Sequence, residues 1–234
     1  MENQKPITQI GLVVALPTRG KKIAFEWAIC FGAQNYPVNL HRWIVPVKGK
    51  PIDEARTKIA EFALKEKAKY VWFLDDDVTV PFFGARRLIY DLEQADDDVM
   101  VAGGIYPTKE IPAAPLVFKQ HGTGPFWKWK KGEVFECSGI GTGCMLVKTE
   151  VFTKLSPPWF KTVDIAHTNG QTSSETQTDD LYFCDRVIEA GYKILADGNV
   201  LGIHWDYQTD PPTPYALPED SWPMKEEKEA GLMA

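Results

Sequence analysis

Cysteine is scarce in this 234-residue chain, with only four residues, and no two of them have the C-x-x-C spacing. That spacing is typical of zinc ribbons and of dithiol redox pairs, so the sequence predicts neither kind of site. We expect reduced thiols, packed mainly in the core, at Cys30, Cys137, Cys144 and Cys184.

Long apolar segments are also missing. No run approaches the length needed to cross a bilayer, and the polar residues from Met1 to Pro6 lack the apolar core of a signal peptide. We therefore expect a soluble, cytoplasmic protein without a membrane span. The net charge of -6 argues against a surface whose main task is to bind a phosphate backbone. With 44% hydrophobic residues, the chain can bury the core of one domain, alone or with a small appendage.

Short apolar runs alternate with helical patterns in the first half of the chain. A run that ends in turn residues is typical of a central strand, and apolar residues at helical spacing are typical of a helix that covers a sheet. The order βαβαβαβ predicts an α/β fold with a doubly wound, mostly parallel sheet. The expected strands are 10–16, 39–45, 70–74 and 99–102, and the expected helices are 22–34, 52–63 and 81–94.

Three consecutive aspartates, Asp75, Asp76 and Asp77, follow the apolar run 70–74. Parallel sheets bind their ligands at the carboxyl ends of the strands, so this position favours a functional role. Crowded carboxylates repel one another unless a cation or a proton intervenes. Mg2+ or Mn2+ would satisfy them, because both ions prefer oxygen ligands. The structural alternative is a solvated acidic turn before the next helix.

Aromatic residues and lysines alternate in the segment 126–135, on either side of Lys131 and Gly132. This pattern predicts a β-hairpin with one aromatic and one basic face, packed at the edge of the sheet. A binding surface for a sugar or a nucleic acid is the alternative, because rings stack on bases and lysines contact phosphates.

Three glycines, Gly139, Gly141 and Gly143, precede an apolar run that predicts a further strand. Glycines allow backbone to approach a ligand closely, although their order is not the G-x-G-x-x-G of dinucleotide sites. A flexible loop would explain them equally well.

Two further acids, Asp179 and Asp180, open a predicted helix, and His204 ends a short apolar strand. One acid is expected to cap the helix, which leaves the other free to act as a general base. A single histidine is more often a hydrogen-bonded core residue than a ligand, but at a strand end it could complete a metal site begun by carboxylates.

Taken in order from Ile10 to Trp205, these segments resemble the GT-A fold glycosyltransferases, in particular the large inverting family 2 type. The resemblance implies a single Rossmann-like domain. Its expected limits are 1–209, with a nucleotide-binding half (1–104), an acceptor and catalytic half (105–209) and a proline-rich tail (210–234).

The resemblance also implies the residues that bind the donor. The first nucleotide-contacting loop would include Pro17, Thr18 and Arg19, and the second would include Asp53 and Arg56. Arg19 or Arg56 would offer forked donors to a phosphate or a base. Asp75 and Asp76 would lie near the nucleotide, and Gly143 would line the donor sugar.

For the chemistry, the resemblance implies Asp77 and His204 as ligands of Mn2+ or Mg2+, and Asp180 as the base that deprotonates the acceptor hydroxyl. The donor would be a nucleotide-diphosphate sugar, with uridine as the commonest nucleoside in such enzymes, and the expected stereochemistry is inversion. A saccharide is the expected acceptor; a modified DNA base is less favoured because the chain is acidic. Asp179 stands where such enzymes often have glutamate.

Two other functions use the same residues. The run from Val71 to Thr79 matches the D-x-D-x-T pattern of haloacid-dehalogenase-like phosphatases, in which the first aspartate, here Asp75, attacks phosphorus and Asp77 completes the motif. That motif normally follows the first strand of its fold, whereas two strand-helix units precede it here. The other alternative is a non-catalytic module that binds a carbohydrate or a metal ion.

Overall fold

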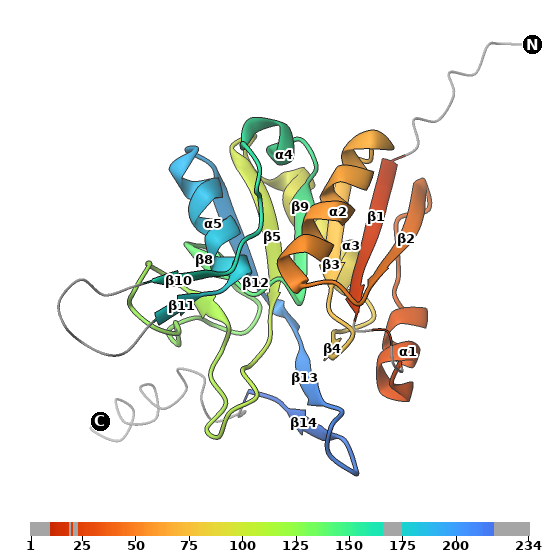
Figure 1. Cartoon of the computed structure of the whole chain (residues 1–234), viewed down its shortest axis with the longest axis vertical. Helices are drawn as coiled ribbons and strands as arrows, with labels where there is room; N and C mark the ends of the chain where they lie inside the picture. The colour runs from red at the N-terminus through yellow and green to blue at the C-terminus, as the bar shows by residue number, and fades with distance from the viewer. Residues whose placement is uncertain (1–9, 19, 21–22, 166–174, 218–234) are drawn as a thin grey trace, which may run out of the picture.

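A computed structural model describes residues 10–18, 20, 23–165 and 175–217. Its centre is a seven-stranded sheet with the strand order β2-β1-β3-β9-β5-β12-β7 (Figure 1). The elements of the first half are β1 (Ile10–Thr18), α1 (Phe25–Gly32), β2 (Leu40–Lys48), α2 (Ile52–Lys65), β3 (Tyr70–Leu74), β4 (Val78–Thr79), α3 (Gly84–Gln94) and β5 (Val99–Ile105). Those of the second half are β6 (Val117–Phe118), β7 (Val134–Cys137), β8 (Gly139–Ile140), β9 (Cys144–Lys148), α4 (Val151–Lys154), β10 (Val163–Ile165), β11 (Glu175–Gln177), α5 (Asp179–Glu189), β12 (Lys193–Leu201), β13 (Ile203–Asp206) and β14 (Thr213–Tyr215).

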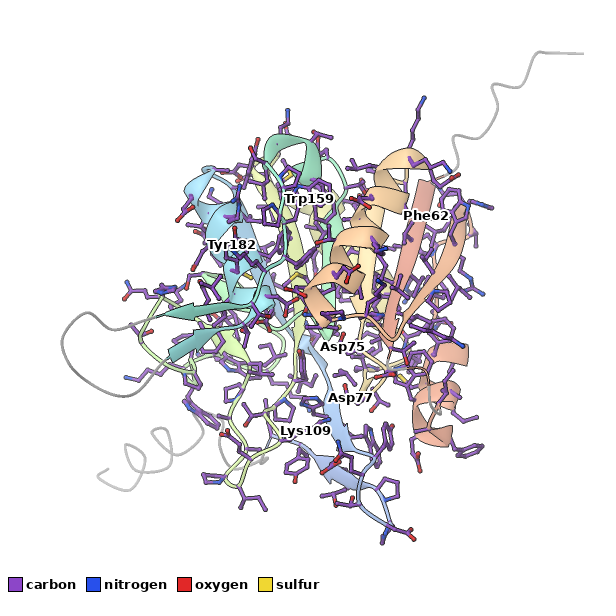
Figure 2. All side chains as sticks on the ribbon, in the orientation of Figure 1. Phe62, Asp75, Asp77, Lys109, Trp159 and Tyr182 are labelled. Atoms are coloured by element: carbon purple, nitrogen blue, oxygen red, sulfur yellow. The ribbon has the colours of Figure 1, made fainter. Side chains whose placement is uncertain are left out.

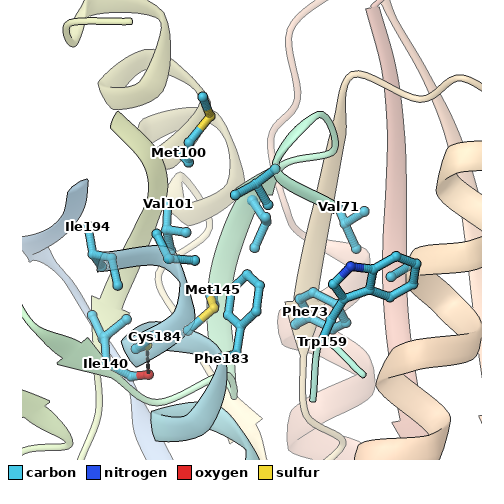
Figure 3. Close-up of a cluster of buried hydrophobic side chains, with 14 of the residues drawn as sticks. Val71, Phe73, Met100, Val101, Ile140, Met145, Trp159, Phe183, Cys184 and Ile194 are labelled. Atoms are coloured by element: carbon cyan, nitrogen blue, oxygen red, sulfur yellow. Dashed lines mark hydrogen bonds between the residues drawn. The ribbon is translucent and has the colours of Figure 1, made fainter. Parts of the chain in front are cut away.

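Helices cover both faces of the sheet, as the alternating pattern predicts. Alternate residues of β1 enter two different cores: Val13 packs with α2, α4 and α5 on one face, and Leu12 packs with α1 and α3 on the other. Figure 3 shows part of the first core, where Phe183 of α5 lies near Met145 of β9 and Phe73 of β3. The mixed α/β layers are compatible with a Rossmann-like fold.

Strand β3 is fully buried along its whole length. Val71 and Phe73 join the core under α2 and α5, while Tyr70, Trp72 and Leu74 join the core under α3. A strand buried on both faces has a continuous apolar sequence, which is why it could be predicted from the sequence. The three aspartates follow its carboxyl end and therefore lie where the parallel strands of the sheet end.

The sheet is less parallel than a simple βαβ repeat predicts. Strand β9 lies between β3 and β5 and is antiparallel to both, and the edge strand β7 is antiparallel to β12. The other five strands all run in one direction. The apolar run of β9 predicts a strand, but its insertion between β3 and β5 depends on pairing with residues far away in the sequence.

The predicted edge hairpin is wrong in its first arm. Residues 126–130 form no strand, whereas β7 pairs with β12 at the edge of the sheet. The first arm packs through its rings instead: the Phe126 and Trp129 rings lie 5.5 and 6.3 Å from that of Phe135. These ring contacts hold the first arm, and no ladder forms between it and β7.

A second, smaller sheet lies beside the carboxyl ends of the main strands (Figure 1). Its order is β14-β13-β4, and His204 of β13 pairs with Val78 of β4. The Trp205 N–H also donates to the carbonyl of Asp77 at 2.8 Å. This sheet therefore fixes His204 beside the aspartates. Strand β14 belongs to the predicted C-terminal tail, whose last residues, 218–234, lie outside the described residues.

None of the helices in the described ranges is long and apolar enough to cross a membrane. Within the same ranges the four cysteines are free thiols, three of them buried, as the sequence predicts.

Candidate functional site

The three aspartates after β3 have three different environments; Figure 2 labels Asp75 and Asp77 below the strand. Asp75 contacts an arginine, Asp76 contacts a threonine, and Asp77 contacts a lysine and a histidine. Backbone contacts fix the turn: Trp27 Nε1 donates to the Asp75 carbonyl at 2.8 Å, and the Asp75 N–H donates to the Gly143 carbonyl at 3.2 Å. A solvated acidic turn would not need these long-range partners.

Arg56 connects two of the predicted acids. One terminal nitrogen contacts both oxygens of Asp75 at 2.9 and 3.0 Å, and the other donates to Asp179 at 2.7 Å. The arginine is 4% exposed. Burial alone would lower the pKa of Arg56, but the charges of Asp75 and Asp179 raise it above its ordinary value. Arg56 therefore holds the first turn of α5 against the end of β3.

In the ligand-free protein Arg56 serves this ion-pair network, and its predicted role as a forked donor to a phosphate or a base stays a prediction. Both terminal nitrogens already serve carboxylates inside the protein. Its role in the structure is to compensate buried negative charge and to position α5. Arg19, the other candidate for this contact, lies outside the described residues.

The acidic pair at the start of α5 divides its tasks. Asp179 is buried and contacts Arg56. Burial raises the pKa of Asp179, although the charge of the arginine opposes this. Asp180 is half-buried, and its carboxylate accepts from the Leu181 N–H at 2.9 Å and from the hydroxyl of Thr178. Both bonds go to Oδ1 of Asp180 in the first turn of α5, whereas Asp179 is committed to Arg56. Asp180 is the more accessible acid of the two.

Asp77 lies between two basic side chains. Its Oδ1 is 3.5 Å from His204 Nε2, and its Oδ2 is 2.5 Å from Lys109 Nζ (Figure 2). Burial would raise the pKa of Asp77, but the bonds to His204 and Lys109 lower it below its ordinary value. The structure therefore brings Asp77 and His204 together, as the sequence predicts. It also adds Lys109, which the sequence analysis missed because nothing in its proline-rich loop signals a charged site.

The pair Asp77 and His204 fits a divalent cation. Two ligands about 2.1 Å from one ion, at about a right angle to it, lie about 3.0 Å apart, close to the observed separation. His204 Nδ1 contacts the carbonyl of Pro107 at 2.9 Å, and such a bond leaves Nε2 free to bind a metal. No group of three or more His, Cys, Asp and Glu residues that could hold a metal occurs in the part of the chain that the structure describes. Mg2+ and Mn2+ are commonly held by one or two protein ligands together with substrate phosphates.

Asp76 faces a cavity of about 280 Å³ at the ends of β1 and β2. The Thr18 hydroxyl donates to Asp76, and burial raises the pKa of this carboxyl. The volume is near the lower end of the range for small-molecule sites. Residues that line the cavity are Leu16, Thr18, Gly20, Ile23, Trp27, Pro46, Lys48 and Asp76. Trp27 and Lys48 were not predicted, since only the fold brings α1 and the end of β2 to this place.

Two predicted donor-binding residues have clear structural roles. Asp53 lies in the first turn of α2, where it accepts from the Glu54 N–H at 2.8 Å and the Thr162 N–H at 3.4 Å. Gly143 packs against Tyr106: its N–H donates to the tyrosine hydroxyl at 2.9 Å, and a Cβ at this position would lie 2.6 Å from that oxygen. The glycine is thus needed for a close approach by a side chain of the protein itself.

The fold is shared with a protein of known structure. No protein-family model matches the chain, and no curated protein sequence matches it. The chain has the fold of A197 from STIV. The TM-score is 0.60 at 16% identity, over 89% of this chain and 91% of that one. A structure of GalNAc-T7 with UDP, GalNAc and Mn2+ also aligns, over 85% of this chain and 38% of that one, at 11% identity. Its TM-score of 0.44 does not establish a shared fold.

Proposed function

We propose that this protein is a GT-A type glycosyltransferase of the inverting family 2 kind, which moves a sugar from a nucleotide-diphosphate sugar to an acceptor hydroxyl with the help of Mn2+ or Mg2+. One observation carries the proposal: the cavity beside Asp76, the pair of Asp77 and His204, and the accessible acid Asp180 are grouped around the carboxyl end of β3. The half-domain 1–104 supplies the donor cavity, and 105–209 supplies His204 and Asp180.

The cavity is suited to a nucleoside. Trp27 and Ile23 offer apolar contacts, while the Asp76 carboxylate and the Thr18 hydroxyl can bond ribose hydroxyls or the edge of a base. Lys48 places a positive charge at the rim, where a diphosphate would be attracted. We take uridine as the expected nucleoside, which rests on the resemblance to the family.

Asp77 and His204 would hold the cation. When bound, a divalent ion stabilises the negative charge that develops on the leaving diphosphate. His204 is oriented for this by Pro107, and Asp77 remains ionised because its pKa is lowered.

Asp180 would act as the base. The acceptor oxygen forms a bond to the anomeric carbon while the bond from that carbon to the diphosphate oxygen breaks, and the acceptor proton passes to Asp180. Arg56 places this acid through Asp179, which lies next to it at the start of α5. Burial raises the pKa of Tyr106, and the negative charges of Asp75 and Asp180 raise it further. Asp180 therefore also acts electrostatically on Tyr106, the residue that supports the glycine loop. We propose a saccharide hydroxyl as the acceptor.

The phosphatase alternative is not supported by the contacts of Asp75. A nucleophilic carboxylate must reach phosphorus, whereas both oxygens of Asp75 are bound to Arg56. Asp75 also follows the third strand of the chain, not the first.

The proposal is tested by release of UDP from a panel of UDP-sugars with Mn2+, without an added acceptor or with simple saccharides. We expect release from one donor. Asp180→Asn should lower the rate at least about 100-fold with donor affinity unchanged, because a general base contributes about 10²- to 10⁴-fold. Equal release by Asp180→Asn would refute the role of this acid. Donor binding by both proteins without any turnover would favour a carbohydrate-binding module.

A further inference from the structure

Lys109 occupies the position of a cation in the site. Its ammonium lies 2.5 Å from Oδ2 of Asp77, while Oδ1 of the same carboxylate faces His204. The two partners are partly exposed, with 32% and 29% of their side-chain surfaces accessible. An ion pair of this kind can open and close at little cost, unlike the buried pairs of Arg56.

The backbone around Lys109 is fixed. The loop from Tyr106 to Leu116 is closed by three bonds: Thr108 N–H to the Ala114 carbonyl at 2.8 Å, Ala114 N–H to the Thr108 hydroxyl at 3.1 Å, and Leu116 N–H to the Tyr106 carbonyl at 2.9 Å. The Pro107 carbonyl of the same loop contacts His204. These bonds hold the two ends of the loop together beside the histidine, and Lys109 reaches Asp77 through its flexible four-carbon stem.

A divalent ion on Asp77 and the ammonium of Lys109 would repel each other, because both are cations drawn to one carboxylate. The metal, with the greater charge, would weaken the bond between Lys109 and Asp77. A diphosphate bound to the same metal would offer the released ammonium a new anionic partner within reach of its four-carbon stem.

We propose that Lys109 pairs with Asp77 in the ligand-free protein and neutralises its charge. When metal and nucleotide bind, the Lys109 side chain leaves Asp77 and its ammonium pairs with the donor diphosphate. The lysine competes with the metal in the first state and supports the nucleotide in the second. Metal and nucleotide therefore bind with positive coupling, and each increases the affinity for the other. The second state rests on the proposed function, whereas the first does not.

The test compares wild-type protein with Lys109→Met by titration calorimetry. Mn2+ alone should bind Lys109→Met about tenfold more tightly, because the competing cation is gone. With Mn2+ saturating, UDP should bind Lys109→Met about tenfold less tightly, because a charge-assisted bond to phosphate is lost. The matched control is Lys119→Met, because the ammonium of Lys119 donates to the Glu136 carbonyl at 2.6 Å, and both affinities should remain at wild-type values. Thermal unfolding of each variant verifies that it is folded.

Unchanged or weaker Mn2+ binding by Lys109→Met overturns the competition between lysine and metal. Unchanged or tighter UDP binding overturns the transfer to the diphosphate. If wild-type protein binds Mn2+ but no nucleotide, the proposed function fails, while the comparison with Mn2+ alone still tests the first state. If no variant binds Mn2+, the competition is refuted, and a UDP titration in chelator then tests the nucleotide cavity separately.

Discussion

Replacing Arg56 with methionine would leave the buried carboxylate of Asp179 and the partly buried carboxylate of Asp75 without their cation. Asp75 and Asp179 both rely on this side chain, at 2.9 and 2.7 Å. Removing one partner of a buried pair typically costs about 3–5 kcal/mol, because the remaining charge is desolvated without compensation. We expect Arg56→Met to lower the free energy of unfolding by about this amount at neutral pH.

The loss should depend on pH in a defined direction. Without Arg56, burial raises the folded-state pKa of both carboxyls above the unfolded value of about 3.9. The penalty is then absent below the unfolded pKa and grows as the pH rises through the interval between the two values. When the pH is lowered from about 7 to about 5, the difference in the free energy of unfolding between wild type and Arg56→Met should therefore become smaller.

Urea unfolding of both proteins at the two pH values measures this effect, with Arg86→Met as the control because Arg86 is exposed on α3. A loss below about 1 kcal/mol, as for a surface pair, would refute the network as a structural element. A loss that is equal at both pH values would refute its electrostatic origin.

Two further predictions concern other parts of the fold. Burial and the Asp197 carboxylate raise the pKa of Asp91 although Arg87 opposes this, so the contribution of this group to stability falls as the pH rises from about 4 through neutrality. Asp91→Asn should flatten this dependence, by up to about 1.4 kcal/mol per pH unit, in urea unfolding across the interval, and an unchanged slope would exclude Asp91 as its source. Gly143→Ala should destabilise the protein by about 1–3 kcal/mol, because its Cβ would lie 2.6 Å from the Tyr106 hydroxyl. The double variant with Tyr106→Phe should recover only part of this loss, because the phenyl ring keeps the carbon Cζ 2.7 Å from the added Cβ; no recovery at all would exclude the hydroxyl oxygen as a cause.

The parts of the fold that depend on local sequence could be predicted. The runs that became β1, β3 and β5 are apolar because they are buried, and helices lie on both faces of the sheet as expected. The failures involve contacts that the local pattern does not specify. Residues 126–130 were predicted as a strand, but they form none and pack through the rings of Phe126 and Trp129 on Phe135.

The candidate site shows the same limit. Asp77 and His204 could be singled out because each follows a short apolar run in the sequence, and the structure brings them together. His204 does not end a strand as predicted; it lies within β13. The ion pairs of Arg56 could not be predicted because its partners lie 19 and 123 positions away. Lys109 could not be identified at all, since only the closed loop and the small sheet place it on Asp77.

The most direct test of the account is a thermal-shift comparison of wild-type protein and Asp77→Asn with UDP and other nucleoside diphosphates, with and without Mn2+. A ligand that binds only the folded state increases the free energy of unfolding, by about 2.7 kcal/mol at a concentration 100 times its Kd, and so raises the melting temperature. If Asp77 holds the metal of a nucleotide site, the melting temperature of wild-type protein rises only when both Mn2+ and one nucleotide are present. Asp77→Asn then shows no such rise. No rise with any nucleotide, together with hydrolysis of a simple phosphate ester, would contradict it.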